Sequence, residues 1–277
     1  MQDSYGRIID YLRISITDRC NLACFYCMPE NGCHFERRQL LSYERITEIS
    51  AVAVHDFGFR KIRITGGEPL MRRDVVKLIT MLGVLKSPGA LEELAMTTNG
   101  VLLAKLAQDL RAAGLDSVNV SLDTLDERLY AAITGGGKLA GVMDGVRAAI
   151  AAGLRVKINT VVLLPEDQVA TGGTAQDIDA VRTFAKSLGA DHQCIARYHL
   201  DHRKQDPENA GISRLSSCVA CNRLRLLSDS TLKPCLHADI SVPVDFGDIA
   251  GSFCKAIDRK PAHGTVCTQK ALVQIGG

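Results

Sequence analysis

The sequence predicts an α/β fold, a partial (β/α)6 barrel followed by a C-terminal region with cysteines of its own. Three observations support this prediction. Six strand-like segments, all but the last followed by a helical segment, alternate along the chain. Cysteine-rich, glycine-rich or polar motifs follow the first four strand-like segments. The 277 residues are 46% hydrophobic, enough for the core of one large domain or two small ones.

Each element follows from a local pattern. The expected strands span residues 11–16, 61–65, 91–98, 117–123, 155–164 and 191–200. The expected helices, with apolar residues at helical spacing, span residues 42–59, 74–85, 102–114, 140–153 and 175–189. Ser42 precedes the first helix and Gly114 ends the third, as start and stop signals do. A doubly wound open sheet would show the same alternation, and we leave that alternative open.

The chain divides into a partial barrel over residues 1–200 and a C-terminal region over residues 201–277. The polar segment 199–217 between them indicates a loop. No apolar run reaches the roughly 18 residues that cross a bilayer, and the N-terminus lacks a secretory signal. The net charge of +2 gives no reason to expect binding of nucleic acid or of a membrane. We expect a cytoplasmic protein and leave open whether it forms a homodimer.

Six of the ten cysteines fall into two groups. The first is Cys20, Cys24 and Cys27, spaced C-x3-C-x2-C, and the second is Cys218, Cys221 and Cys235. In a reducing compartment, clustered cysteines bind metal or do redox chemistry more often than they pair. Structural zinc takes four ligands, whereas three thiolates on an iron–sulfur cubane leave one iron open for a substrate or cofactor. The first spacing favours the cluster, with zinc and unrelated thiols as alternatives.

The other four cysteines have no partner spacing, and their roles stay open. They are Cys33, Cys194, Cys254 and Cys267. A buried free thiol is the default interpretation for Cys33, Cys254 and Cys267.

Motifs at successive strand ends predict a ligand site, because chemistry in a β/α barrel takes place at the C-terminal ends of the strands. The first strand leads into the three-cysteine loop. The second ends in "TGGEP", where Gly66 and Gly67 allow a backbone to approach a ligand and Glu68 can accept hydrogen bonds from an amine. The third ends in "TTNG" and the fourth in "SLD". Each motif alone is typical of a turn or a helix cap, but four together indicate a site.

The set "CNLACFYC", "GGEP", "TTNG" and "SLD" resembles the radical S-adenosylmethionine (SAM) superfamily. The resemblance implies a 4Fe–4S cluster on Cys20, Cys24 and Cys27 whose open iron chelates the amino and carboxylate groups of SAM. One-electron transfer then gives a 5′-deoxyadenosyl radical that abstracts hydrogen from a substrate. The implied cofactor contacts, with Tyr26 packed by the adenine, are Tyr26, Gly66, Gly67, Glu68, Ser121 and His199.

Longer segments, among them "KIRITGGEPLMRRD", "CVACNRLRLLSDSTLKPCL" and the end "QIGG", resemble the GTP 3′,8-cyclase family of molybdenum-cofactor biosynthesis. This implies a radical SAM lyase that converts GTP to (8S)-3′,8-cyclo-7,8-dihydroguanosine 5′-triphosphate, the first step toward molybdopterin. The second cysteine group would bind another 4Fe–4S cluster, and Gly276 and Gly277 would reach into the active site. The implied GTP contacts are Arg13, Arg63, Thr97, Lys157, Arg223 and Arg225.

The positively charged residues on the strands support a nucleotide substrate independently of the family resemblance. The cations on or beside the strands are Arg13, Lys61, Arg63, Lys157, Arg223 and Arg225. Cations inside a barrel are costly unless they meet anions, and Arg is suited to bidentate contact with phosphate. We therefore include Lys61 among the substrate contacts. The alternative is that these residues lie on the rim or in ion pairs.

The chain also departs from the family. It is shorter than members usually are, "RYHL" stands where "EYMP" is common, and Cys194 stands near an arginine of the family. His199 thus replaces a methionine that would touch the cofactor. These departures favour an alternative, a two-cluster radical SAM enzyme for a different nucleotide, natural product or peptide. A non-catalytic iron–sulfur or zinc protein is the third hypothesis.

For the enzyme, we expect an electron donor such as flavodoxin or ferredoxin, and a downstream enzyme of the molybdopterin pathway as a further partner.

Overall fold

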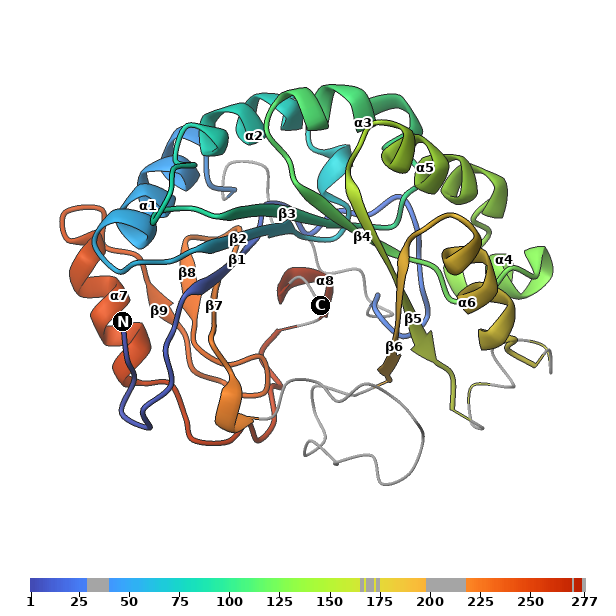
Figure 1. The fold of residues 1–277 in the computed structure, drawn as a ribbon. Coiled ribbons are helices and arrows are strands. Elements are labelled where there is room, and N and C mark those ends of the chain that lie inside the picture. Colours follow the sequence, from blue (N-terminus) through green and yellow to red (C-terminus); the bar gives the residue numbers. More distant parts are fainter. Residues whose placement is uncertain are drawn as a thin grey trace.

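The structure is a computed structural model that describes residues 1–28, 40–164, 167, 172, 175–197, 218–270 and 272–275. Its central feature is a nine-stranded sheet in the order β6-β5-β4-β3-β2-β1-β7-β8-β9. The sheet forms an arch whose convex face is covered by helices (Figure 1). The strands are β1 (Tyr11–Ser15), β2 (Lys61–Thr65), β3 (Glu93–Thr98), β4 (Ser117–Ser121), β5 (Arg155–Val162), β6 (Asp191–Ala196), β7 (Arg223–Leu226), β8 (Thr231–Lys233) and β9 (Val242–Pro243).

Strands β1 to β6 are parallel, and each lies beside its neighbour in sequence. This order confirms the partial (β/α)6 barrel. It excludes the doubly wound alternative, in which the strand order reverses at a switch point and helices cover both faces. Within the described residues the arch stays open, because β6 and β9 end the sheet without pairing to each other.

The five predicted helices are confirmed. They are α1 (Tyr43–His55), α2 (Val75–Gly83), α3 (Leu103–Ala112), α5 (Leu139–Ala151) and α6 (Ile178–Ser187). The hydroxyl of Ser42 accepts a hydrogen bond of 3.2 Å from the amide of Arg45, as an N-cap does. Sequence analysis missed α4 (Glu127–Thr134), although Asp126 caps its start and Gly135 ends it with φ of +68°. None of the helices among the described residues is long and apolar enough to cross a membrane.

The C-terminal residues extend the same sheet. β7 pairs in parallel with β1, and β8 and β9 follow as antiparallel strands. α7 (Ile249–Asp258) packs Phe253 against Phe57 and Phe59, with ring centroids 5.1 and 5.8 Å apart. The predicted boundary at residue 200 lies outside the described residues. On both sides of it the described residues share one sheet and one core.

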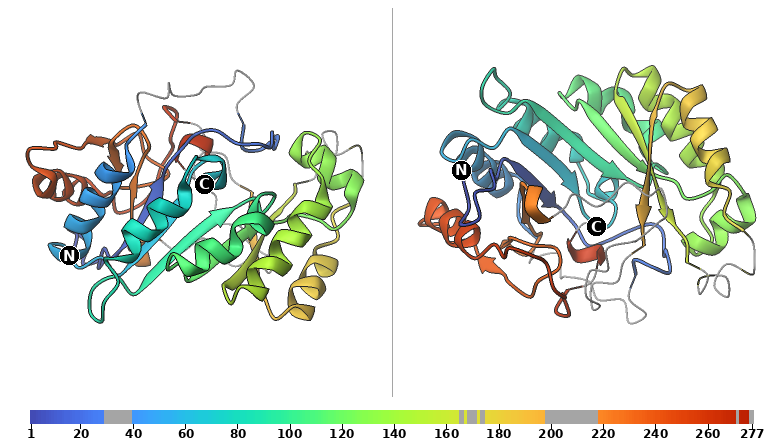
Figure 2. Two further views of the ribbon diagram at one scale, coloured as in Figure 1. Left: turned by 90° about the horizontal axis from the view of Figure 1, so that it is seen from above. Right: turned by 60° about the horizontal axis from the view of Figure 1, so that its bottom comes forward.

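Three short helices complete the described elements. They are η2 (Pro69–Met71), η4 (Cys218–Ala220) and α8 (Leu272–Ile275). α8 lies on the concave side of the arch, far in sequence from the strands that surround it (Figures 1 and 2). There Ile275 is buried with Leu227 and Cys267.

The two faces of the parallel strands differ in chemistry because side chains alternate along a strand. Residues that point toward the helices are apolar and fully buried: Leu12, Ile14, Ile62, Ile64, Leu94, Met96, Val118 and Val120. The alternate residues, on the concave face, are mostly polar or charged: Tyr11, Arg13, Ser15, Lys61, Arg63, Thr65, Thr97, Asn119, Ser121 and Lys157. The core therefore lies outside the arch, and the polar interior is left for a ligand.

Candidate functional site

The first cysteine group lies in the loop after β1, at the C-terminal edge of the sheet, as predicted. Burial raises the pKa of Cys24, and negative charge on Cys27 and Cys20 raises it further. Burial, with a contribution from Cys20, raises the pKa of Cys27 to about 12. The three thiols are thus crowded, and the described residues place no cation beside Cys24 or Cys27 that lowers its pKa. They fit a positively charged metal centre, which favours thiolates.

The two metal alternatives differ in the number of protein ligands. Structural zinc takes four ligands on one atom, whereas three thiolates on a cubane bind three different irons. Among the described residues, no three His, Cys, Asp or Glu side chains are grouped so that they could hold a single metal ion.

Gly66 and Gly67 hold the start of the cysteine loop. The amide of Gly67 donates to the carbonyl of Thr17, and the amide of Glu68 donates to that of Arg19, both at 2.7 Å. A Cβ added to Gly66 or Gly67 would lie 2.4 Å from one of these carbonyl oxygens. The sequence predicts that a backbone segment or ligand comes close to these glycines. In the structure, the backbone at the start of the cysteine loop occupies this position. A contact with SAM stays a prediction.

Glu68 joins the ends of two strands. Its carboxylate accepts hydrogen bonds from the amide of Leu70 (3.0 Å), the hydroxyl of Thr98 (2.8 Å) and the amide of Asn99 (2.7 Å). Burial raises the pKa of Glu68 to about 7, against the lowering effect of these bonds. The "GGEP" and "TTNG" motifs therefore form one unit. The predicted bond from an amine of the cofactor would be added to three bonds from the protein.

Asn99 extends this unit to the cysteine loop. Its side-chain amide donates to Oδ1 of Asn21 at 2.8 Å and to the sulfur of Cys20 at 3.7 Å. The amide of Leu22 also donates to this sulfur, at 3.5 Å. Hydrogen bonds of this kind stabilise a thiolate. Sequence analysis noted the "TTNG" motif but did not assign Asn99 to a cysteine.

The "SLD" motif holds the other end of the loop. Asp123 is buried and accepts hydrogen bonds from the hydroxyl of Tyr26 (2.5 Å) and the amide of Val161 (2.8 Å). The missed helix α4 also contributes, because the carbonyls of Thr134 and Ile133 accept from the amides of Ala23 and Phe25. Two sequence signals could have revealed these contacts: Asp123 ends a strand-end motif, and Asp126, three residues later, is a helix-capping residue. The loop is therefore bound both by strand-end motifs and by the end of α4.

Five of the predicted substrate contacts lie in two rows across the concave face. Arg13 pairs in register with Arg63 on one side and Arg225 on the other. Nearer the cysteine loop, Lys157 and Thr97 flank Asn119. Arg223 lies in a third row, opposite Tyr11. The structure thus brings together guanidinium groups from strands that are far apart in sequence.

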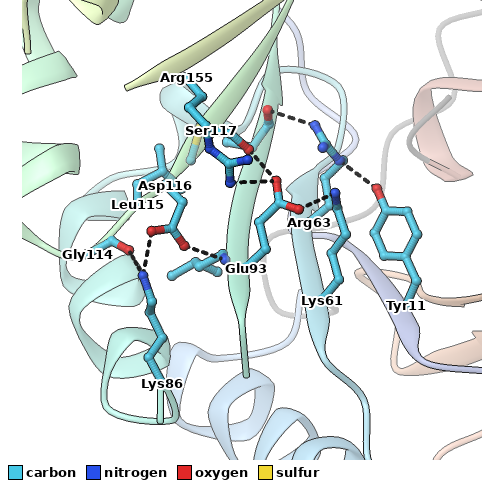
Figure 3. Close-up of polar contacts among 12 residues, drawn as sticks. Tyr11, Lys61, Arg63, Lys86, Glu93, Gly114, Leu115, Asp116, Ser117 and Arg155 are labelled. Carbon is cyan, nitrogen blue, oxygen red and sulfur yellow. Dashed lines mark hydrogen bonds and ion pairs between the residues drawn. The ribbon is translucent and has the colours of Figure 1, made fainter. Parts of the chain in front are cut away.

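Tyr11, which sequence analysis missed, lies beside Arg63 and Lys61 on the concave face (Figure 3). Its hydroxyl accepts a hydrogen bond of 2.6 Å from Nε of Arg63. Lys61 and Arg223 lie over its ring, 5.3 and 5.7 Å from the centroid. Burial would raise the pKa of Tyr11, but the charges of Arg13, Arg63 and the other cations outweigh burial and lower it. Its position, two residues before Arg13 on one strand, was the available signal.

Lys61 and Arg63 differ in their partners, although both point to the concave face. Lys61 forms an ion pair with Glu93, which also binds Ser117 at 2.7 Å and Arg155 at 3.5 Å (Figure 3). The bonds of Arg63 to described residues go to neutral oxygens, the hydroxyl of Tyr11 and the carbonyl of Met96. Arg63 therefore keeps a charge for a ligand, whereas the charge of Lys61 is compensated within the protein.

The second cysteine group surrounds the start of β7. Cys218 and Cys221 lie just before the strand, and Cys235 follows β8. Burial raises the pKa of Cys235, and Cys221 and Cys218 add to the shift. Burial would also raise the pKa of Cys221, but the charges of Lys260 and Arg223 and the hydrogen bonds from these two residues together outweigh it and lower that pKa. The three thiols are close to one another, and one of them already has a cation beside it.

The remaining predicted residues are placed as follows. Ser121 ends β4 opposite Asn159. Cys194 lies on β6, Cys254 packs against the core, and Cys267 is buried. His199, Cys33, Gly276 and Gly277 lie outside the described residues. Ile275, just before the two glycines, is buried.

Comparison with known proteins gives one matching family, described as the radical SAM superfamily, over residues 14–177. The chain is 36% identical to a GTP 3′,8-cyclase of Heliobacterium modesticaldum over 332 residues, covering 100% of both chains. It is 39% identical to a GTP 3′,8-cyclase of Thermodesulfovibrio yellowstonii over 283 residues, covering 88% of this chain and 87% of the relative. The first alignment is longer than this chain, which therefore lacks residues that the relative has.

Solved structures support the fold. SuiB of Streptococcus suis matches with a TM-score of 0.53 and 18% identity, over 82% of this chain and 60% of SuiB. The structure described as native anSMEcpe with bound AdoMet matches with a TM-score of 0.51 and 17% identity, over 72% of this chain and 54% of that chain. The chain thus spans less than two thirds of these solved chains, and the likeness concerns their fold.

Proposed function

The chain belongs to the radical SAM superfamily and, within it, to the GTP 3′,8-cyclase family, and we propose that it converts GTP to (8S)-3′,8-cyclo-7,8-dihydroguanosine 5′-triphosphate. It is then a radical SAM lyase that acts at the start of molybdopterin biosynthesis. The observation that carries this proposal is the row of Arg225, Arg13 and Arg63 across three neighbouring strands, on the concave face below the cysteine loop.

This row suits a triphosphate. Guanidinium groups bind phosphate oxygens in a bidentate manner, and a partly enclosed site strengthens each contact. Arg63 and Arg225 are buried, with 6% of each residue exposed. The net charge of the chain is only +2, so the concentration of cations inside the arch is local. Arg223, Lys157 and Thr97, on the rows to either side, would contact the rest of the nucleotide.

The first cysteine loop would hold the cluster that binds SAM. When bound, this cluster and SAM supply the 5′-deoxyadenosyl radical that takes a hydrogen atom from the substrate. Cys20, Cys24 and Cys27 would bind three irons, and Asn99 supports the sulfur of Cys20. Tyr26 within the loop, and Gly66, Gly67, Glu68 and Ser121 at the strand ends, would contact SAM, as His199 would. The polar concave face beneath them leads to the arginine row.

The second cysteine group would hold the second cluster, on the side of the arch where β7 joins β1. Cys218, Cys221 and Cys235 lie beside Arg223, so a cluster there would be next to the proposed nucleotide site. The burial of Ile275 in α8 supports a role for the chain end, because it anchors the chain directly before Gly276 and Gly277. The two glycines would then enter the space between the clusters.

The reaction further implies a cytoplasmic setting with flavodoxin or ferredoxin as electron donor, and a downstream enzyme that consumes the cyclised nucleotide. The charge of Lys61 is compensated by Glu93. Lys61 would therefore support the substrate site by its position over the ring of Tyr11 rather than by pairing directly with a phosphate.

One observation favours a second candidate function. The alignment with the Heliobacterium cyclase contains residues that this chain lacks. A rim changed in this way could accept another substrate. The second candidate is therefore a radical SAM enzyme with the same two clusters that acts on a different nucleotide, a natural product or a peptide.

The test is anaerobic incubation of the reconstituted protein with SAM and a reductant, with and without GTP, followed by mass analysis of the products. The proposal expects 5′-deoxyadenosine and a product with the mass of GTP and a changed chromatographic position. The second candidate would be supported if SAM is cleaved but GTP does not accelerate the cleavage and is not itself converted. Absence of any SAM cleavage, with the first cluster present, would contradict both.

A further inference from the structure

Lys260, two residues beyond the end of α7, is a buried cation that none of the predicted sites includes. Only 3% of the residue is exposed. Its ammonium donates hydrogen bonds to the carbonyls of Arg223 and Pro234, both at 2.7 Å, and to the sulfur of Cys221 at 3.5 Å. The three donors of the ammonium thus have three acceptors, and no carboxylate is among them.

The charge of Lys260 requires a negative partner. A buried ammonium costs several kcal/mol unless it is paired, and two carbonyl dipoles compensate it only in part. The remaining acceptor is the sulfur of Cys221. Lys260 is therefore best accommodated when this cysteine is a thiolate, which is its state as a metal ligand.

The three bonds also join three segments. Arg223 begins β7, Pro234 immediately precedes Cys235, and Cys221 lies in the loop after η4. Lys260 thus fixes two of the three cysteines relative to each other. Arg7 fixes the third cysteine, because its guanidinium donates to the carbonyl of Cys218 at 2.8 Å. The same guanidinium donates to the carbonyls of Pro261 and Ala262, which directly follow Lys260.

We propose that Lys260 is a positioning residue of the second cluster, and that its hydrogen bond to the thiolate of Cys221 makes this cluster easier to reduce. The inference rests on the second cluster of the proposed function. Hydrogen bonds to ligand sulfurs and nearby positive charge stabilise the reduced, more negative state of an iron–sulfur cluster. Removing the ammonium should therefore shift the reduction potential to more negative values, even if the cluster assembles fully.

The experiment uses the full chain with Cys20, Cys24 and Cys27 replaced by Ala, so that only the second cluster contributes. In this background Lys260→Met, Lys260→Arg and Lys233→Met are prepared anaerobically. Iron and sulfide are quantified, and the potential is measured by a dithionite titration followed by electron paramagnetic resonance. Lys233 is the matched control, because it is 1% exposed and donates to the carbonyl of Ala238 rather than to a cysteine.

We expect a more negative potential for Lys260→Met, a potential near that of the parent for Lys260→Arg, and no shift for Lys233→Met. Loss of iron in Lys260→Met, with full iron in Lys233→Met, also supports the proposal. An unchanged potential in fully loaded Lys260→Met would overturn it, as would equal loss of iron in both methionine variants. If the parent binds no iron, the second cluster of the proposed function fails first, so the two failures are distinguishable.

Discussion

The hydroxyl of Tyr26 donates a hydrogen bond of 2.5 Å to the carboxylate of Asp123. Tyr26 lies between Cys24 and Cys27, whereas Asp123 ends the "SLD" motif after β4. The same carboxylate accepts the amide of Val161 in β5. One side chain therefore ties the cysteine loop to two strands of the arch. Together with Gly67 and Asn99, it shows that the strand-end motifs hold the cysteines in place.

Tyr26→Phe tests this bond. Loss of the hydroxyl leaves a buried carboxylate oxygen of Asp123 without its partner, which costs about 1–3 kcal/mol. We expect a lower free energy of unfolding for the metal-free protein and faster loss of iron from the first cysteine group. Chemical denaturation and iron release to a chelator measure the two effects. Phe25→Leu, a change at the neighbouring ring without a hydroxyl, is the control, and equal iron release from both variants would contradict the prediction.

Gly67→Ala tests the contact between "GGEP" and the cysteine loop. A Cβ at residue 67 would lie 2.4 Å from the carbonyl oxygen of Arg19, so the loop must move. We expect incomplete loading of the first cluster, measured as iron per chain, and little SAM cleavage. Gly141→Ala is the matched control, because the nearest atom to its Cβ is 3.9 Å away and Ala is favoured in a helix by about 0.5–1 kcal/mol. Full loading of Gly67→Ala would refute the argument.

Arg225→Ala tests the arginine row. Loss of a charge-assisted contact worth about 1.5–3 kcal/mol should weaken GTP binding by about 10- to 100-fold. Cleavage of SAM without substrate should stay measurable, because the cysteine loop is not touched. Binding is measured by anaerobic calorimetry. Arg182→Ala, which removes an exposed partner of Asp179 on α6, should leave both properties unchanged. If Arg225→Ala loses binding and cleavage equally, the residue is structural.

Tyr11→Phe tests the residue that orients Arg63. The ring stays between Lys61 and Arg223, but Nε of Arg63 loses its acceptor. A hydrogen bond that involves a charged group is worth about 1.5–3 kcal/mol, so we expect GTP binding to weaken by about 10- to 100-fold. Uncoupled SAM cleavage should not change. Unaltered affinity for GTP, in a protein with both clusters, would show that Tyr11 does not position Arg63.

Asp239→Ala tests the anchoring of the chain end. The carboxylate of Asp239 accepts hydrogen bonds from the amides of Thr268 and Gln269 and the hydroxyl of Thr268, a few residues before α8. Burial would raise the pKa of Asp239, but these bonds lower it to about 2. The contact therefore persists at any pH used for assay. We expect both clusters and SAM cleavage to be retained while conversion of GTP falls.

Deletion of Gly276 and Gly277 is the companion to this variant. It should leave the fold, the clusters and SAM cleavage nearly intact and abolish conversion of the bound nucleotide. Product analysis by mass spectrometry measures the loss. Full conversion by the truncated chain would exclude a role for the two glycines and weaken the case for GTP as substrate.

The sequence by itself determined the elements and the chemistry of the first site. Apolar periods of two and 3.6 residues are local, so they predicted six strands and five helices correctly. Within the barrel they missed the short helices η2 and α4. The spacing of Cys20, Cys24 and Cys27 is also local, and it predicted the loop that follows β1. The parity of Arg13 and Arg63 along their strands placed both on one face.

Only the tertiary structure decided how these parts meet. The pairing of β7 with β1 puts Arg225 beside Arg13, although 212 residues separate them in the chain, and no periodicity encodes that register. Likewise, the structure pairs Lys61 with Glu93 but gives Arg63 neutral partners. It turns Asn99 and Asp123 toward the cysteine loop and places Lys260 against Cys221. Such contacts depend on strand register and side-chain packing between distant segments, which local sequence patterns do not contain.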